Sequence, residues 1–128
     1  MTIRRVTTES APAAIGPYSQ AMVGGGLVFC SGQIAIDPET GRMVGVSVTE
    51  QTRQALANLA AVLEAAGCGL DRVVKTTVYL ESMDQFGAMN EVYEQVFASH
   101  KPARAAVEVS ALPKGALVEI DAIALRGD

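Results

Sequence analysis

The sequence predicts an α+β fold in which two helices pack on one face of a mixed β-sheet, in the order β-β-β-α-β-α-β-β. Three observations lead to this prediction: short segments alternate apolar and polar residues, two longer segments repeat apolar residues at helical spacing, and turn sequences rich in Gly and Pro separate them. The length of 128 residues, with 49% hydrophobic and 19% charged residues, suits one domain over residues 1–128.

The first third of the chain is expected to form three strands. Residues 3–8 form the first, and residues 18–23 and 27–31 form a hairpin through the Gly24-Gly25-Gly26 turn. The Asp-Pro-Glu-Thr-Gly run at residues 37–41 is a turn cluster that ends this region.

Two segments have the apolar spacing of amphipathic helices. Ser47 and Glu50 form a capping box at the start of the first, and Gly67 ends it. After a β-branched strand at residues 73–80, Ser82 or Asp84 can cap the second helix, and Pro102 follows its end. The first stripe consists of Leu56, Leu59, Ala60, Leu63 and Ala66, and the second of Phe86, Met89, Tyr93, Val96 and Phe97.

Two further strands, residues 103–110 and 116–126, are joined by a turn at residues 112–115. Their period-two patterns, and that of residues 73–80, predict one apolar face per strand, directed at a common core. The apolar sets are Ala105, Val107 and Val109; Val118, Ile120, Ala122 and Ala124; and Val74, Thr76, Val78 and Leu80.

The opposite face of these three strands mixes charged with apolar residues. It would carry Lys75, Tyr79, Arg104, Glu108, Glu119 and Asp121 beside Leu117, Ile123 and Leu125. Because both helices are expected on the other side, we interpret this second face as a subunit interface that holds a small polar site.

Composition excludes several classes of function. Ten basic and fourteen acidic residues give a net charge of −4 with no basic block, so neither nucleic acid nor an anionic membrane is an expected partner. No apolar stretch reaches the roughly 18 to 20 residues of a membrane span, and the first residues lack a secretion signal, so we expect a cytoplasmic protein. With one histidine and two cysteines, Cys30 and Cys68, outside any motif, we expect free thiols and no metal site.

Several segments resemble the Rid family, also called the YjgF family, and most closely its RidA branch of 2-iminobutanoate/2-iminopropanoate deaminases. The resemblance runs from about residue 3 to residue 125. It rests on APAAIGPYSQ at residues 11–20, SGQ at 31–33, VKTT at 74–77, Asn90, PAR at 102–104, LPK at 112–114 and EIDAIA at 119–124.

The resemblance implies a chorismate-mutase-like subunit, a homotrimer, and three sites in the clefts between subunits. It implies that Arg104 binds the substrate carboxylate and that Glu119 orients water or transfers a proton. The remaining site positions that match are Tyr18, as a second catalytic residue, and Ser31, Gly32, Asn90 and Ala106, for substrate binding, with backbone groups contributing near Gly32 and Ala106.

The chain departs from the family pattern in three places. Lys101 occupies a position where an aromatic residue is common, Asp121 one where glutamate is usual, and Ala106 one where some members have cysteine. The first two changes could alter the packing of the pocket rim or the preferred substrate size.

The predicted activity is hydrolytic deamination of 2-aminoacrylate, 2-iminopropanoate and 2-iminobutanoate to 2-oxo acids and ammonium. Hydrolysis of these enamines and imines is already thermodynamically favourable. An enzyme therefore need only hold the substrate carboxylate, protonate the enamine carbon and deliver water, and it needs no cofactor. An arginine offers the planar two-point fork that a carboxylate requires.

Each candidate residue also has a structural interpretation. Arg104 could form a salt bridge with Glu108 or Glu119, and Glu119 could pair with Lys75 or Arg104 at an interface. Tyr18 could be a packing aromatic, Ser31 could satisfy backbone groups in a turn, and Asn90 could cap a helix.

Two other functions remain open at this stage. A non-catalytic trimer could use the same clefts to sense 2-oxo acids or to bind client proteins, although a sensor of carboxylates needs the arginine and not the glutamate. A ribonuclease activity has been attached to relatives of the family, and the acidic composition argues against it here.

Overall fold

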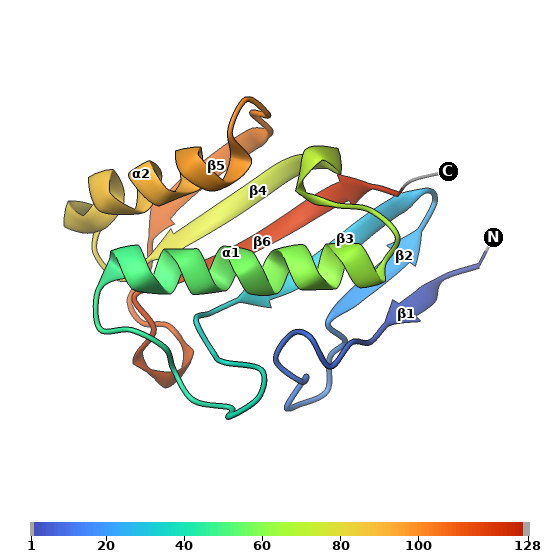
Figure 1. Cartoon of the computed structure of the whole chain (residues 1–128), viewed down its shortest axis with the longest axis horizontal. Helices are drawn as coiled ribbons and strands as arrows, with labels where there is room; N and C mark the ends of the chain where they lie inside the picture. The colour runs from blue at the N-terminus through green and yellow to red at the C-terminus, as the bar shows by residue number, and fades with distance from the viewer. Residues whose placement is uncertain (1, 127–128) are drawn as a thin grey trace.

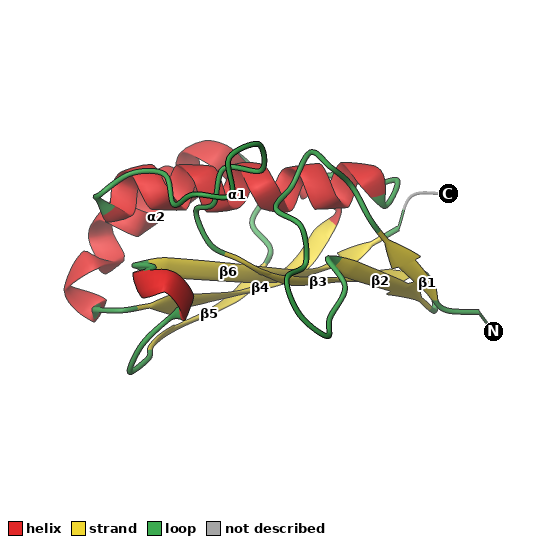
Figure 2. Ribbon diagram, turned by 90° about the horizontal axis from the view of Figure 1, so that it is seen from below, coloured by secondary structure: helices red, strands yellow, loops and turns green. Residues whose placement is uncertain are grey.

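In the computed structural model, which describes residues 2–126, two helices cover one face of a six-stranded sheet (Figures 1 and 2). The predicted α+β class and order of elements are confirmed; residues 1, 127 and 128 of the predicted domain lie outside the described residues. The strands are β1 (Arg4–Val6), β2 (Ala21–Gly24), β3 (Leu27–Gln33), β4 (Val73–Leu80), β5 (Ala103–Glu108) and β6 (Val118–Leu125), and the helices are α1 (Val48–Ala65) and α2 (Phe86–Phe97). Short 3-10 turns η1 (Leu70–Arg72), η2 (Met83–Gln85) and η3 (Pro113–Gly115) lie between them.

The sheet has the strand order β1-β2-β3-β6-β4-β5. Within residues 2–126, β4 and β5 are the only strands that pair in parallel, and α2 connects them as the crossover. All other neighbours are antiparallel, beginning with the predicted hairpin of β2 and β3, whose turn residues Gly25 and Gly26 have φ of 59° and 79°. Two successive positive φ values suit a two-residue hairpin turn and favour glycine.

The predicted capping box begins α1. The Ser47 hydroxyl accepts from the Glu50 backbone N–H at 3.2 Å, and the Glu50 carboxylate accepts from the N–H groups of Ser47 and Val46 at 3.3 and 3.0 Å. These bonds lower the pKa of Glu50. Ser82 instead caps η2, the turn that leads into α2.

The core lies between the helices and the centre of the sheet. The predicted apolar face of β6 is confirmed, because its four members are all buried. The same prediction for β4 is wrong at one end: Val74 is 47% exposed and Val73 is buried in its place. The pairing of β4 with β6 shifts register between Val73 and Lys75, which changes the face that each residue presents.

The predicted orientation of β5 is wrong. Its pairing with β4 aligns Arg104 with Thr76 and Ala106 with Val78, both of which face the helices. Ala106 therefore packs against the core, whereas Ala105 and Val107 are exposed on the other side, and Val109, beyond the strand, is half-buried. Period two separates the two faces of a strand, but in an edge strand it does not say which one meets the helices.

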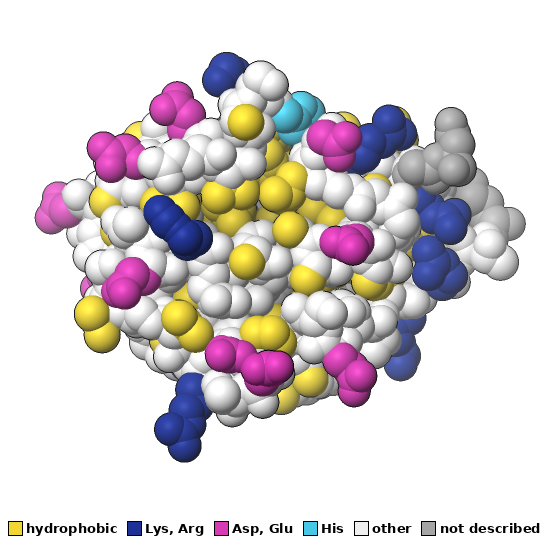
Figure 3. Space-filling model, in the orientation of Figure 1, with side chains coloured by type: hydrophobic (Ala, Val, Ile, Leu, Met, Phe, Trp, Pro, Cys, Tyr) yellow, Lys and Arg dark blue, Asp and Glu magenta, His cyan; other side chains and the backbone are white. Residues whose placement is uncertain are grey.

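Among the residues that the structure describes, no helix covers the other side of the sheet, which we call the open face (Figure 2). Figure 3, drawn from the helix side, shows apolar side chains mainly in the furrow between the helices, with charged side chains around them. The open face carries Phe29, Lys75, Thr77, Tyr79, Ala105, Val107, Glu119, Asp121, Ile123 and Leu125.

The strained residue after α2 gives a test of the fold. Ala98 has φ of 56° and ψ of −120°, a conformation that glycine adopts freely and residues with a Cβ rarely adopt. We expect Ala98→Gly to raise the free energy of unfolding by about 1 kcal/mol, measured by urea denaturation. Ser99→Gly, at an exposed neighbour without positive φ, is the control, and a loss of stability in Ala98→Gly would contradict the expectation.

Candidate functional site

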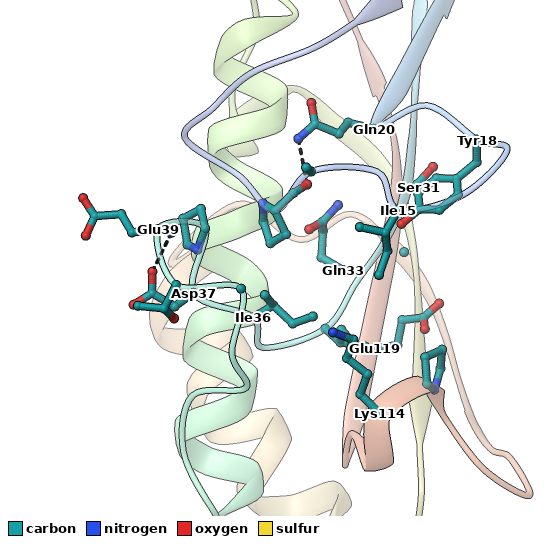
Figure 4. Close-up of a pocket in the computed structure, with 18 residues that line it drawn as sticks. Ile15, Tyr18, Gln20, Ser31, Gln33, Ile36, Asp37, Glu39, Lys114 and Glu119 are labelled. Atoms are coloured by element: carbon teal, nitrogen blue, oxygen red, sulfur yellow. Dashed lines mark hydrogen bonds between the residues drawn. The ribbon is translucent and has the colours of Figure 1, made fainter.

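A cavity of about 720 Å³ lies between the loop that precedes β2, the loop that follows β3, and η3 (Figure 4). Its lining includes four of the predicted site residues: Tyr18, Ser31, Gly32 and Glu119. The sequence interpretation missed other lining residues, among them Gln20, Gln33, Ile36 and Lys114. Of these, Gln20, Gln33 and Lys114 lie in the motifs quoted above, so their positions in those motifs were the available signal, whereas Ile36 lies in none of them. The φ of 57° at Lys114 could not be read from the sequence.

The side chain of Gln20 holds the loop that carries Tyr18. Its amide oxygen accepts from the Thr8 N–H at 2.7 Å, and its amide nitrogen donates to the carbonyls of Thr8 and Pro12 at 3.0 and 2.8 Å. Gln20 is 4% exposed, so these bonds form away from solvent and fix residues 8–12 against the start of β2. Tyr18 itself is 53% exposed at the rim of the cavity.

Ser31 serves the backbone, as its structural interpretation anticipated. Its hydroxyl donates to the Ser19 carbonyl at 2.6 Å, and its N–H donates to the Gln20 carbonyl at 3.0 Å. Because the hydroxyl proton is already engaged, Ser31 can offer a ligand only its oxygen lone pairs unless this bond breaks.

Gly32 lies directly beneath the side chain of Glu119. The pairing of β3 with β6 is irregular between Cys30 and Gln33, and a Cβ built on Gly32 would lie 2.7 Å from the Glu119 carboxyl carbon. Only glycine leaves this space free. Glu119 projects over the backbone of β3, half-buried at the wall of the cavity.

The carboxyl group of Glu119 is shifted toward its protonated form. Burial raises its pKa, and the negative charge of Asp121 raises it further. Lys75 lies opposite Ile123, four residues from Glu119 along β6, which corresponds to about 13 Å. The register therefore gives no support to an ion pair between Lys75 and Glu119.

Arg104 and Asn90 form a second cluster on the helix side of the sheet. The guanidinium donates to the Asn90 amide oxygen at 2.6 Å, and its central carbon lies 4.8 Å from the Tyr93 ring centroid and 5.4 Å from that of Phe86. A smaller cavity of about 350 Å³ opens there, beside His100 and Lys101. Asn90 therefore orients Arg104 rather than capping a helix.

The prediction that Arg104, Glu108 and Glu119 share one face is wrong for Glu119 within a single chain, whereas Arg104 and Glu108 pair with the buried Thr76 and Leu80 and do share the helix side. Arg104 contacts uncharged groups, and Glu108 accepts from the Met83 N–H at 2.7 Å. Glu119 lies on the open face of β6, two strands away from β5, which amounts to about 10 Å across the sheet. The structure thus brings Tyr18, Ser31, Gly32 and Glu119 together, and separately Asn90, Arg104 and the neighbouring Ala106.

The described residues offer neither a cluster of metal ligands nor a membrane-spanning helix. Within residues 2–126, no three His, Cys, Asp or Glu side chains lie close enough to hold a metal ion. No helix in the same range is long and apolar enough to cross a membrane.

The chain is similar to known proteins over nearly its whole length. The family model described as endoribonuclease L-PSP matches residues 8–126. A human protein named 2-iminobutanoate/2-iminopropanoate deaminase is 51% identical over 126 residues, covering 98% of this chain and 92% of the human protein.

Two solved structures have the same fold. YyfA from Yersinia pestis, described as a Rid family protein of unknown function, superposes with a TM-score of 0.94 at 48% identity, covering 96% of this chain and 98% of that one. TdcF from E. coli, crystallised with bound serine, has a TM-score of 0.92 at 41% identity, covering 97% and 99%.

The close approach at Gly32 gives a prediction about Glu119. In Gly32→Ala the added methyl group must displace the Glu119 carboxyl toward solvent, so the pKa of Glu119 should fall toward its ordinary value while the fold remains. Titration of ¹³C-labelled glutamate carboxyls by NMR measures this change. Gly87→Ala is the matched control, because a Cβ at Gly87 meets nothing within 4 Å; an unchanged Glu119 titration in Gly32→Ala would contradict the packing described.

Proposed function

Because the chain belongs to the endoribonuclease L-PSP family of YjgF and Rid proteins, we propose that it hydrolyses short 2-imino and 2-enamino acids to 2-oxo acids and ammonium. The human relative named for this activity supports the proposal at 51% identity. The observation that carries the proposal is a pair of side chains suited to a small carboxylic acid. Arg104, oriented by the Asn90 amide, lines one cavity, and Glu119, whose pKa is raised, lines the other.

The proposed enzyme is a homotrimer with one site in each of three clefts between subunits. Phe29, Val107 and Leu125 are 46%, 41% and 45% exposed on the open face, which favours burial against other copies of the chain. In a closed ring, the edge strand β5 of one subunit can approach the open face of the next. Arg104 and Asn90 of one chain would then meet Glu119, Gly32 and Tyr18 of its neighbour, and neither set is complete alone.

Arg104 is the proposed anchor for substrate. Its fork binds both oxygens of the substrate carboxylate, while the bond to Asn90 and the rings of Phe86 and Tyr93 fix the guanidinium plane. This orientation places carbon 2 and carbon 3 of the substrate toward the neighbouring subunit's Glu119.

Glu119 is the proposed proton donor. Its O–H bond breaks as a C–H bond forms at carbon 3 of the enamine, and the electron pair of the nitrogen completes a C=N bond to carbon 2. Water then adds to carbon 2, a proton moves to nitrogen, and ammonia leaves as the 2-oxo acid forms. Glu119 regains its proton from the added water, and Tyr18, at the rim, closes the cavity over the reacting carbons.

The first test uses a serine dehydratase to generate 2-aminoacrylate in the presence of semicarbazide. The protein should lower semicarbazone formation and speed pyruvate release. Arg104→Ala should lose about 100-fold of this activity, because two charge-assisted hydrogen bonds to the carboxylate are lost, and Arg104→Lys should recover only part of it. Arg53→Ala, which removes an exposed arginine of α1, is the control.

Four results would contradict the proposal. Wild-type protein without effect on trapping, but with saturable binding of 2-oxo acids, would favour the non-catalytic sensor; capture of unfolded client proteins without turnover would favour the client-binding module. Cleavage of single-stranded RNA lost in Arg104→Ala would favour the ribonuclease. Full activity in Arg104→Ala would remove the proposed role of the arginine.

Mixing two inactive variants tests the shared site. Arg104→Ala and Glu119→Gln each damage every site when alone, but in mixed trimers some sites take an intact Arg104 from one chain and an intact Glu119 from the other. Equal mixing by unfolding and refolding should restore about a quarter of wild-type activity. If both residues acted within one chain, mixing would restore none.

A further inference from the structure

Glu119 belongs to a group of three polar side chains on the open face that the proposed mechanism does not fully use. Asp121 lies two residues further along β6 and points to the same side. Tyr79 lies directly opposite Glu119 on β4, and its hydroxyl donates to the Asp121 carboxylate at 2.9 Å. The two carboxyl groups therefore flank one phenol, and the phenol bonds to only one of them.

This asymmetry distinguishes two otherwise similar acids. Carboxyl groups at i and i+2 of a strand are about 7 Å apart, and both are half-buried here, so ionising both at once is unfavourable. The bond from the Tyr79 hydroxyl fixes the Asp121 carboxylate beside Glu119, where its negative charge opposes ionisation of Glu119. Unequal environments for paired acids are how enzymes assign one as anion and the other as proton donor.

The proton affinities agree with this division. Burial is the larger cause of the raised pKa of Glu119, and the negative charge of Asp121 is the second cause. Burial also raises the pKa of Tyr79, and the hydrogen bond to Asp121 and the charges of Asp121 and Glu119 raise it further, so the phenol remains a neutral donor.

Other charged groups face this region from several elements. Lys75 on β4 lies opposite Ile123. Lys114 of η3, and Tyr18 of the loop that precedes β2, line the same cavity as Glu119 (Figure 4). Asp37 and Glu39 line it from the loop after β3, whereas the cavity residues of β3 itself are uncharged. None of these groups is among the causes of the raised pKa of Glu119, which leaves Asp121 as its electrostatic partner.

We infer that Asp121 and Tyr79 are positioning residues for proton transfer by Glu119: the Tyr79 hydroxyl fixes the Asp121 carboxylate beside Glu119, and the negative charge held there favours the form of Glu119 that donates a proton to the enamine carbon. The inference rests on the proposed function for the role of Glu119, and it adds two residues to the proton-transfer machinery. In the assembled trimer a neighbouring Arg104 would favour the ionised form of Glu119, and Asp121 offsets that effect.

The direct test is an NMR titration of the Glu119 carboxyl in the intact protein. Asp121→Asn removes the neighbouring charge, so Glu119 should titrate at a pH lower by about 0.5 to 1 unit. Tyr79→Phe should shift it in the same direction by less, because the Asp121 carboxylate is then no longer held beside Glu119. Asp121→Glu keeps the charge and should keep the titration near wild type, and Glu64→Gln, which removes an exposed charge from α1, is the control.

The same variants change the pH dependence of kcat/KM. The limb of the pH profile of kcat/KM that disappears in Glu119→Gln reports the titration of Glu119. In Asp121→Asn this limb should move to lower pH, by the same shift that NMR measures for the carboxyl group. If Glu119 titrates unchanged in Asp121→Asn, the inference is wrong even though the deaminase activity stands. If the titration shifts but the wild-type protein has no deaminase activity, the coupling of the three groups holds and the proposed function is what fails.

Discussion

Within residues 2–126, two helices cover only one face of the six-stranded sheet, and both the exposed apolar side chains and the placement of the polar residues follow from this arrangement. A twisted sheet buries both faces only when each has a partner, and here Phe29, Val107 and Leu125 remain exposed on the uncovered side. The same side carries Tyr79, Glu119 and Asp121, which would be unusual inside a purely apolar interface. The mixture suits a surface that other subunits cover while leaving a polar cleft.

The division of the polar residues between the two sides follows from the sheet. Arg104 lies on the helix side of an edge strand, where Asn90 of α2 can reach its guanidinium at 2.6 Å. Glu119 lies on the open face of β6, with β4 between it and β5. A site that needs both groups therefore depends on assembly, and this is how an exposed apolar surface and a proposed catalytic function become linked.

Local backbone geometry sets the environment of the acid. The irregular pairing of β3 near Gly32 lets the Glu119 side chain lie across the backbone, half-buried beside Asp121. Two glutamates show how local environment sets proton affinity: Glu50 has a lowered pKa because its carboxylate caps α1, and Glu119 has a raised one because it is buried beside a like charge. Cys30, buried in the core, has a pKa raised to about 12 and contributes packing.

The sequence by itself determined the elements, their order, the capping box at Ser47, the glycine hairpin and the buried face of β6, because these depend on periodicity and on local backbone preferences. Its motifs also led to the prediction of which side chains form the site. Only the tertiary structure decided that Val73 replaces Val74 in the core, that Arg104 faces the helices, that Asn90 orients it and that the Ser31 hydroxyl is already engaged. Alternation along a strand fixes which residues share a face, but the register with neighbouring strands fixes where that face points, and register comes from contacts distant in sequence.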